Sequence, residues 1–580
     1  MVAAWALAAA GVVVALALAV AGRHRGVWGD EGTYLAMTAS LARDGDLAFD
    51  DRDRKWALTR PDAVPATLIL QHVDTGVSYS KPVVYPLLAL PAYLLLGARG
   101  LVVTNLLLTA AALLAAWSLL RRLGPPNRAA LTLLTFAGCS VLPFYLGWRM
   151  SDMAQVACAL AGLALVAGAL RAPAARRPQA DGTPLSDEGL RNGLRRVAAG
   201  GLLLGLLGAM RLPGLALAAT AVAGAVWLGR RRAAAAVAFA AVLGFALAGG
   251  AGLALTGSAN PYKEVRASFN GTTGYPVADS EAWQRFDSNP ATQMAGLLPR
   301  FEWTRSLYSG LYYLGGRHTG LLIYFPAVLA LLAAAWRGRD RLALALLAGP
   351  AAIALFYLLW LPENYFGGST FFGNRYFLGA YPALLAALPR LPSARALALS
   401  WLVGLIVGVS ALVSMLGVTE HSAPSQSHVA AGVFRLLPSE TTAQNVDGFR
   451  GRYWGQDFVR FVDRFADDDA DGFRLAAGAP PAEIELAIRV PRDTLRLVVD
   501  PGGRGGELIW RDWLGGGALP LAPGPQQVEL TLSPAWRWHT YWWRVPDIYQ
   551  VRTLRLGFRA AAGGQVELSY PPPGRGRRKR

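Results

Sequence analysis

The sequence is organised around Trp28-Gly-Asp-Glu-Gly-Thr-Tyr-Leu-Ala-Met-Thr-Ala-Ser-Leu-Ala-Arg-Asp-Gly-Asp-Leu47. This stretch follows the apolar segment Val2–Ala21, and so it places two adjacent carboxylates, Asp30 and Glu31, close to a membrane surface. Apolar residues then recur at spacings of three and four up to Gly45, which predicts a short amphipathic helix lying along the bilayer. Carboxylates at a helix start can simply cap it, because the helix dipole favours negative charge there. The pair alone therefore leaves a structural and a functional interpretation open.

The composition is that of an integral membrane protein. Of the 580 residues 53% are hydrophobic, and the mean hydropathy is positive at +0.32. Val2–Ala21 has no basic stretch before it and no clear cleavage site after it, so we expect a retained first helix. Cys139 and Cys158 lie in apolar segments and indicate neither a disulfide framework nor a metal site. Much of the formal charge of +18 lies in arginine-rich short loops, where membrane topology explains it, and no nucleic-acid partner is expected.

Ten apolar segments suit bilayer crossing, and one of them can bend back as two short helices, which predicts about 11 crossings. The segments lie near residues 2–21, 100–120, 129–147, 153–170, 197–229, 233–256, 319–336, 341–361, 374–390 and 396–417. Arginine-rich short loops stay in the cytoplasm, and all of them do so if 197–229 bends near Arg211-Leu-Pro213. Residues 22–99, 148–152, 257–318, 362–373 and everything after 418 are then outside. Pro82–Gly97 is apolar but only 16 residues long, and we interpret it as re-entrant or interfacial.

The composition changes beyond the last apolar segment. We assign residues 1–417 to a transmembrane domain, 418–479 to an irregular extracytoplasmic connector, 480–570 to an antiparallel β-sandwich and 571–580 to a basic tail. The predicted strands are Glu483–Arg489, Leu495–Val499, Glu507–Trp510, Gln527–Leu532, Val551–Gly557 and Gln565–Ser569. Six indoles in this domain suit either core packing or stacking on sugars, and we expect at least one to be exposed. They are Trp510, Trp513, Trp536, Trp538, Trp542 and Trp543.

Four short motifs, in this order, resemble those of the GT-C glycosyltransferases. Trp28–Leu35 is similar to their first-loop motif, most closely that of protein O-mannosyltransferases and lipid A aminoarabinose transferases. The segment Tyr79-Ser-Lys-Pro-Val-Val-Tyr85 resembles their Lys-Pro-Pro-Leu-type segment, and Asp152 resembles their acidic residue at the outer end of a helix. Ser369–Phe377 resembles a Gly-x-Arg-Tyr motif of related bacterial chains. The likeness covers roughly the first 170 residues well, is patchy to 417 and does not reach the carboxyl-terminal domain.

The resemblance implies a polyprenyl-phosphate sugar donor. Breaking a sugar–phosphate bond leaves negative charge on the lipid phosphate, which cations and hydrogen-bond donors must stabilise. The groups predicted to bind that phosphate are Lys81, Arg317, His318 and Arg375. An acceptor hydroxyl needs a base; Asp30 matches the family position for it, and Glu31 would orient the acceptor or share a cation. Supporting roles are predicted for Asp152, Tyr85, Arg211 and Asn374.

Several of these residues also have plainer interpretations. Lys81 suits an interfacial anchor, Asp152 a helix cap, Arg211 the corner of a helix hairpin and 315–320 a simple turn. Acidic residues can hold a divalent cation, but no spacing here predicts a defined metal site.

Together these features predict a glycosyltransferase of a bacterial cytoplasmic membrane, with its active site and carboxyl-terminal domain outside. It would move one sugar to a hydroxyl of a glycan, lipid or protein, with inversion. A lipid-sugar transporter or flippase is an alternative, but it would need polar groups throughout the bilayer depth, and here they cluster at the outer helix ends. A non-catalytic subunit of a cell-envelope glycan assembly system is another; the intact Asp30 and Glu31 argue against it.

Overall fold

The computed structural model describes a helical unit and a unit rich in β-strands. The described residues are 30–59, 68–74, 76–171, 187–262, 265–269, 274–276, 303–316, 319–338, 340–361, 365–367, 373–417, 452–454, 457–461, 472–489, 493–534, 537–540, 548–561 and 564–569. The first unit contains residues 1–300, 321–360 and 374–421, and the second contains 301–320, 361–373 and 422–580.

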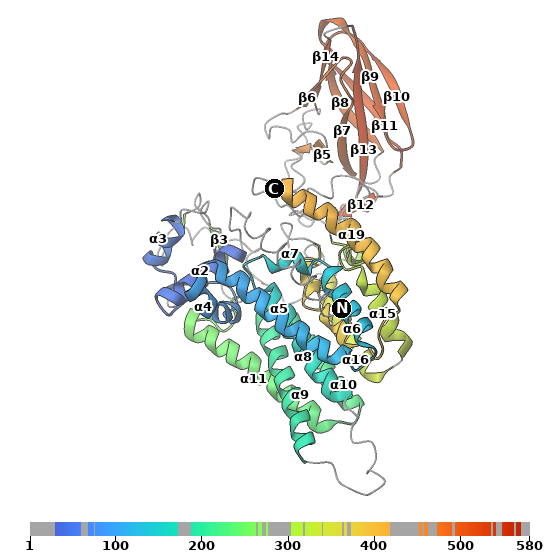
Figure 1. The fold of residues 1–580 in the computed structure, drawn as a ribbon. Helices are drawn as coiled ribbons and strands as arrows, with labels where there is room; N and C mark the ends of the chain where they lie inside the picture. Colours follow the sequence, from blue (N-terminus) through green and yellow to red (C-terminus); the bar gives the residue numbers. More distant parts are fainter. Residues whose placement is uncertain are drawn as a thin grey trace. The chain divides into compact units, whose positions relative to one another are not determined.

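Five helices of the first unit are long and apolar enough to cross a membrane, which makes the chain a multi-pass membrane protein. They are α5 (Arg99–Leu120), α8 (Asp152–Arg171), α9 (Asp187–Met210), α11 (Arg231–Thr256) and α16 (Arg341–Trp360). Several of them run alongside one another in Figure 1. Helix α8 is buried along almost its whole length, so it forms the centre of this unit.

Three segments expected to cross as single helices are divided instead. They form α6 (Pro126–Gly138) and α7 (Leu142–Leu146), α14 (Leu321–Tyr324) and α15 (Ala327–Gly338), and α17 (Arg375–Leu378) and α18 (Pro382–Ala386). Pro143, Pro326 and Pro382 stand at or just before the first turn of the second helix of each pair. Proline is tolerated there, but it disfavours a helical conformation for the residue before it, which explains the interruptions. The expected first crossing, 2–21, lies outside the described residues.

Three other expectations concern the apolar segments around Arg211, after Ala394 and within Pro82–Gly97. The helical segment is interrupted near Arg211, as predicted, by a short 3-10 turn, η1 (Leu212–Gly214), and continues as the 13-residue α10 (Leu215–Trp227). The helix before it, α9, is longer than the short helix expected, with 24 residues. The last helix, α19 (Ala394–Gly417), is continuous. Pro82–Gly97 contains the 13-residue α4 (Val84–Leu96). At about 1.5 Å per residue this helix is roughly 20 Å long, shorter than a bilayer core of about 30 Å, which agrees with a re-entrant or interfacial segment.

Helix α2 (Asp30–Arg43) begins at the acidic pair, as the sequence indicates, and Gly45 follows its end with a φ of 79°. The prediction of an amphipathic helix is wrong, however, because every residue from Glu31 to Leu41 is buried. Small residues such as Ala36 and Ala39 let other parts of the protein pack on all its faces. Asp30 therefore opens a helix that lies inside the protein.

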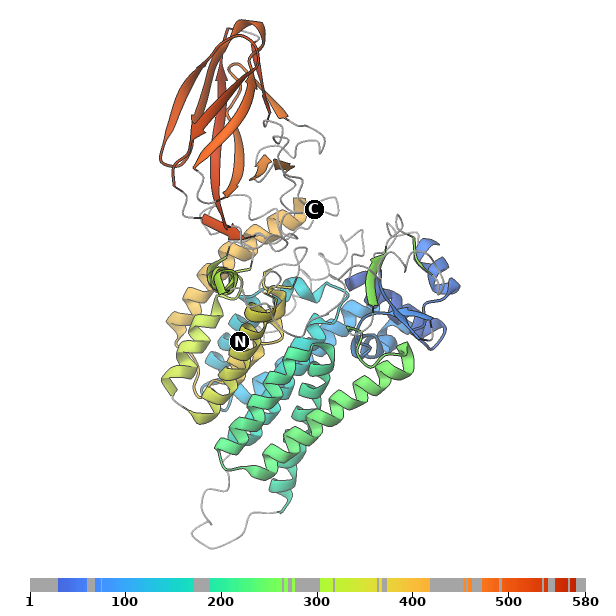
Figure 2. The same ribbon diagram turned by 180° about the vertical axis from the view of Figure 1, so that it is seen from behind.

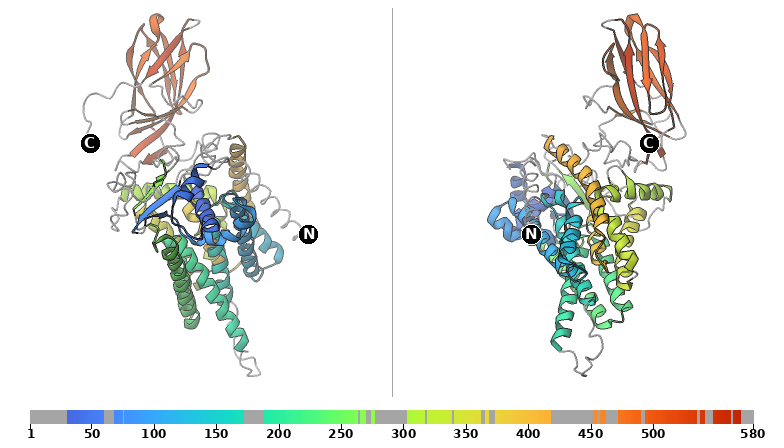
Figure 3. Two further views of the ribbon diagram at one scale, coloured as in Figure 1. Left: turned by 90° about the vertical axis from the view of Figure 1, so that its left-hand side faces the viewer. Right: turned by 45° about the vertical axis from the view of Figure 1, so that its right-hand side comes forward.

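A three-stranded antiparallel sheet joins the two loops that were expected outside the membrane. Strand β1 (Leu68–Val73) pairs with β2 (Gly76–Tyr79) on one edge and with β3 (Val265–Phe269) on the other. Figure 2 shows these strands near the end of α11, and the left view of Figure 3 shows them beside α2 and α4. Since strands of one sheet share one side of a membrane, the pairing agrees with the prediction that both loops lie on the same face.

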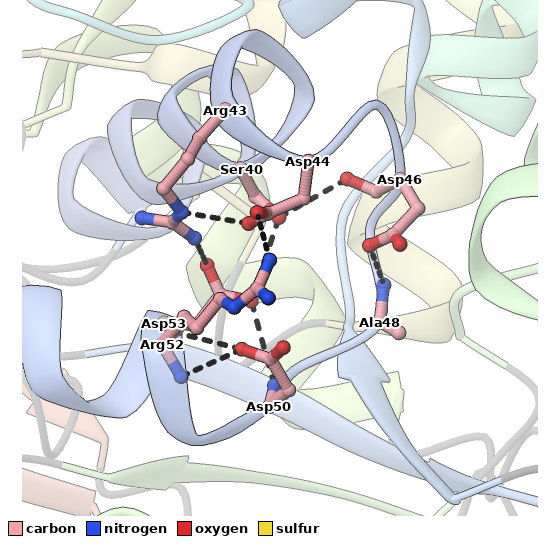
Figure 4. A network of polar contacts seen from close by, with 8 residues as sticks. All are labelled: Ser40, Arg43, Asp44, Asp46, Ala48, Asp50, Arg52 and Asp53. Carbon is pink, nitrogen blue, oxygen red and sulfur yellow. Dashed lines mark hydrogen bonds and ion pairs between the residues drawn. The ribbon is translucent and has the colours of Figure 1, made fainter.

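The carboxyl-terminal end of α2 is tied to the start of α3 (Asp51–Thr59) by the polar network in Figure 4. The Arg43 guanidinium contacts Asp44 at 2.7 Å and the buried Asp53 at 2.5 Å. The Asp50 side chain accepts hydrogen bonds from the backbone N–H groups of Arg52 and Asp53, at 2.8 and 3.0 Å. These contacts fix one end of α2, and so they help to hold Asp30 in place at the other.

The second unit contains a two-sheet antiparallel β-sandwich. One sheet has the order β10-β9-β13-β7-β5-β4, with β12 beside β13, and the other has the order β11-β8-β14-β6. The strands are β4 (Arg452–Trp454), β5 (Asp457–Phe461), β6 (Gly472–Ala476), β7 (Ala482–Arg489), β8 (Thr494–Asp500), β9 (Gly506–Arg511), β10 (Gly516–Leu521), β11 (Gln526–Thr531), β12 (Arg537–Thr540), β13 (Ile548–Arg559) and β14 (Gln565–Ser569). Leucines and valines of both sheets form the core between them. This unit also contains helix α13 (Trp303–Gly315).

The six predicted strands are all present, and the sandwich is larger than expected. Strands β4, β5 and β6 lie within 418–479, so the expectation of a wholly irregular connector is wrong. Short strands interrupted by the acidic run at 467–471 showed too little alternation to be recognised. The basic tail, 571–580, lies outside the described residues.

Candidate active site

Asp30 forms two short ion pairs with residues that are far away in the sequence. Its carboxylate oxygens lie 2.5 Å from Lys81 Nζ and 2.6 Å from Arg375 Nη2. All three side chains are largely buried, and Asp30 is the most accessible of them at 14% exposed. Asp30 starts α2, Lys81 follows strand β2, and Arg375 starts α17. Three of the sequence motifs therefore meet at one carboxylate.

Asp152 extends this contact into a row of alternating charges. Both of its oxygens accept from Arg375, from Nε and from Nη2, at 2.9 Å each. Arg211 Nη2 donates to the same carboxylate at 3.3 Å. Asp152 is 1% exposed and is the first residue of α8. A buried carboxylate of this kind is stable only when it is paired and hydrogen-bonded, and here two guanidinium groups fulfil that need.

The electrostatics of this row favour an additional anion. Its cations are Lys81, Arg211 and Arg375, whereas its anions are Asp30 and Asp152. Burial alone would raise the pKa of Asp30, but the attraction of Lys81 and Arg375 outweighs it and holds that pKa well below its usual range. Burial lowers the pKa of Lys81 to about 8, and the attraction of Asp30 only partly opposes this. A surplus of positive charge in a place with little water attracts anions strongly.

Glu31 and Tyr85 lie near this row and contact other parts of the protein. Glu31 is buried, and its Oε1 accepts from the backbone N–H of Arg149 at 2.8 Å. The Tyr85 hydroxyl donates to the carbonyl of Leu101 at 3.2 Å, and its ring meets Tyr34 edge-on at 5.3 Å. These contacts connect α2 and α4 to the segments that precede α8 and begin α5.

An aromatic stack supports Arg211. Its guanidinium carbon lies 4.6 Å from the centroid of the Tyr376 ring, and that ring stacks on Tyr357 at 4.2 Å. A guanidinium over an aromatic face is attracted by the ring quadrupole. Tyr376 directly follows Arg375 in α17, and Tyr357 belongs to α16. The stack therefore orients Arg211 toward Asp152.

Two contributors to this region, Tyr357 and Arg266, were not predicted from the sequence. Tyr357 gave no signal, because one tyrosine in an apolar helix is ordinary. Arg266, on strand β3, is close enough to Lys81 to help lower its pKa, and its guanidinium lies 4.8 Å from the Tyr262 ring centroid. Arg266 could have been recognised from the sequence as an arginine on a short strand of a predicted outer loop. That strand, β3, was not predicted.

The structure brings five predicted residues into one connected row: Asp30, Lys81, Asp152, Arg211 and Arg375. Asn374 has a structural contact, because its Oδ1 accepts from Phe377 N at 3.1 Å and caps α17. Arg317 and His318 lie outside the described residues. Within the described part of the chain, no three His, Cys, Asp or Glu side chains gather as metal ligands. The catalytic roles assigned to these residues remain predictions.

Comparison with known proteins shows only distant likenesses. No model of a known protein family matches the chain, and no curated protein does. Among solved structures it is similar to ArnT from Cupriavidus metallidurans bound to undecaprenyl phosphate, with a TM-score of 0.44 and 17% identity over 74% of this chain and 68% of that one. The apo state of ArnT gives a TM-score of 0.39 with 18% identity over the same shares. The apo oligosaccharyltransferase of Archaeoglobus fulgidus gives 0.37 with 14% identity, over 70% of this chain and 54% of that one. ArnT and the oligosaccharyltransferase are membrane glycosyltransferases of the GT-C fold.

Proposed function

We propose that the chain is a glycosyltransferase that moves a sugar from a polyprenyl-phosphate donor to a hydroxyl group. The observation that carries this proposal is the row of buried charges in which Asp30 is bound by Lys81 and Arg375. It combines a carboxylate that can accept a proton with cations that can stabilise a phosphate. Acyl transfer or metal-assisted hydrolysis would call for other groups, such as an activated nucleophile or a cluster of metal ligands.

The charge of the row suits the leaving group. A sugar linked to a lipid phosphate carries one negative charge on its phosphodiester, and the released lipid phosphate carries up to two. Lys81 and Arg375 would therefore bind the phosphate more strongly as the sugar–oxygen bond breaks, which is the condition for catalysis. Hydrogen bonds between charged groups of this kind contribute about 1.5–3 kcal/mol each.

Asp30 would act as the base only after the donor has bound. In the ion-paired state its pKa is low, so it has little tendency to take a proton from a hydroxyl. A donor phosphate that draws Lys81 and Arg375 toward itself would raise the pKa of Asp30. The acceptor oxygen would then attack the anomeric carbon, its proton would pass to Asp30, and the polyprenyl phosphate would leave. A single in-line displacement inverts the anomeric centre.

The site lies at one end of the helices, which supports an extracytoplasmic position. Asp152 starts α8, and Arg211 follows the end of α9, whereas Arg171 and Arg230 lie at the opposite helix ends. Because arginine-rich loops favour the cytoplasm, we place the active site on the outer face of a bacterial cytoplasmic membrane. Nucleotide sugars are absent there, so the donor would be lipid-linked.

Binding of undecaprenyl phosphate to the purified protein in lipid nanodiscs tests this proposal. Lys81→Met and Arg375→Met should each weaken binding by about tenfold or more, because each removes a charged hydrogen bond. Arg232→Met is the matched control, since Arg232 is an exposed cation of α11, at the end remote from Thr256 and the β1–β3 sheet. If the Lys81→Met and Arg375→Met variants both bind the lipid as tightly as the wild type does, the row is not a phosphate site. Release of polyprenyl phosphate from a panel of lipid-linked sugars then identifies the donor.

A further inference from the structure

The turn between β9 and β10 holds an exposed tryptophan in a fixed position. Trp513 is 56% exposed, although indoles in folded domains are usually buried for most of their surface. Its Nε1 donates to the carbonyl of Pro534 at 2.9 Å, so the polar edge of the ring is bound to the protein. The exposed part of the side chain is therefore the apolar ring.

Asp512 makes this turn rigid. Its Oδ1 accepts from the backbone N–H groups of Gly515 and Leu514, at 2.6 and 3.0 Å, and from Ser533 Oγ at 2.9 Å. Its Oδ2 accepts from the backbone N–H of Ser533 at 2.6 Å. Burial alone would raise the pKa of Asp512, but these donors together hold it below its usual value. The turn thus stays fixed with its acidic group ionised.

Strand β10, which follows the turn, presents bare backbone. It is the last strand of its sheet among the described residues, so one of its edges faces no other strand. Gly516 and Gly517 are exposed; a side chain would clash with the backbone at Gly516 and would be tightly packed at Gly517. A Cβ on Gly516 would lie 2.7 Å from the Trp510 carbonyl, and one on Gly517 would lie 3.1 Å from the Trp510 indole nitrogen. Backbone N–H and C=O groups are thereby accessible beside the exposed indole.

We infer that this turn is a saccharide-binding site that stacks a sugar ring on Trp513. Indole faces match the apolar face of a pyranose, and free backbone groups of β10 suit its hydroxyls. The orientation of the ring is already fixed, so binding costs little conformational entropy. The exposed Arg511 adds a further hydrogen-bond donor at the end of β9.

The same features argue against other occupants. A stable protein interface buries roughly 800 Å² per partner. The exposed surface of Trp513 and Leu514 together is far smaller than that area. A tryptophan that anchors a protein to lipid uses its N–H at the headgroup level, whereas this one donates to Pro534. The inference rests on the proposed function: it names a glycan chain as the acceptor, held by the β-sandwich through a sugar other than the one that reacts.

Native electrophoresis of the full chain in detergent, through gels containing mannan, dextran or galactan, tests the inference. At least one of these pyranose polymers should slow the wild type. Trp513→Ala should abolish this retardation, while Trp513→Phe, which keeps a ring but loses the bond to Pro534, should retain part of it. Leu514→Ala is the matched control, because Leu514 is the next residue and is 64% exposed.

The outcomes separate this inference from the proposed function. Retardation by none of the polymers, or equal retardation of the wild type and Trp513→Ala, would overturn the saccharide site. Equal loss in Leu514→Ala would also overturn it, since it would show general hydrophobic adhesion, as expected for a protein or lipid contact. Each variant is also tested for undecaprenyl phosphate binding, which should not change. Failure of the wild-type protein to bind undecaprenyl phosphate would instead refute the proposed function.

Discussion

The affinity for polyprenyl phosphate should fall as the pH rises above about 8, the pKa of Lys81. Burial lowers that pKa more than Asp30 raises it, and repulsion by Arg266 and Arg375 lowers it further. Below pH 8 the free protein already carries the Lys81 charge that the phosphate needs. Above pH 8 the amine is mostly neutral and must take up a proton when the lipid binds, so alkaline conditions oppose binding.

The size of the effect follows from this linkage. Each pH unit above the pKa costs a factor of about ten in affinity, or about 1.4 kcal/mol, until the pH reaches the higher pKa that Lys81 has beside a bound phosphate. Between pH 7.5 and pH 9.0 the affinity should therefore fall roughly eightfold. The lipid phosphate itself does not interfere, because its second pKa is about 6 and it stays doubly charged over this range.

Equilibrium binding of undecaprenyl phosphate in nanodiscs, at constant ionic strength from pH 7.0 to pH 9.5, measures this dependence. Lys81→Arg is the informative variant, because a guanidinium stays protonated and its affinity curve should be flat. Lys81→Met should bind weakly at every pH. A flat curve for the wild type, or the same slope in Lys81→Arg, would refute the assignment of this titration to Lys81.

Three further predictions concern the row of charges. Arg375→Met leaves Asp152 without its bidentate partner and Asp30 without one of its two cations, and should lower the free energy of unfolding by about 3–5 kcal/mol; an unchanged melting temperature in detergent would contradict the burial of these ion pairs. Asp30→Asn should reduce sugar transfer about a hundredfold or more while lipid phosphate binding persists, and near-normal transfer would show that Asp30 is not the base. Tyr376→Leu removes the ring under Arg211 and should weaken that contact by roughly 0.5–2 kcal/mol, measured as weaker donor binding. Tyr376→Phe keeps the ring and should bind the donor like the wild type. Equal losses of binding in both variants would assign the effect to the hydroxyl.

The fold was predictable where the sequence pattern is strict. Long apolar runs indicated the crossing helices, and clear alternation indicated strands such as β8 and β13. Strand β10 escaped prediction because Gly516, Gly517 and Pro520 normally break strands, and only pairing with β9 makes them extended. The burial of α2 on all faces was also hidden, because small residues such as Ala39 do not reveal whether they face protein or solvent.

The candidate site was predictable as a set of residues but not as a geometry. Asp152 and Arg375 were predicted from their resemblance to GT-C motifs, and Arg211 because a charge within an apolar stretch is costly unless it faces protein or water. The sequence could not show that Arg375 bridges Asp30 and Asp152, since three segments distant in the chain had to be brought together. Arg211 remained ambiguous for the same reason, because its partner Asp152 is on another helix.

The order in which the charged row is made has a consequence for biogenesis. Asp152 and its bidentate partner Arg375 are 223 residues apart in the chain. At about 5–20 residues per second, a ribosome needs roughly 10–45 s to add the second after the first. During that time Asp152, at the start of helix α8, can pair only with Arg211, which is made 59 residues after it, and still lacks its bidentate partner. A chain truncated before Arg375 should consequently insert less stably into the membrane. Quality-control proteases should degrade it faster than the full chain.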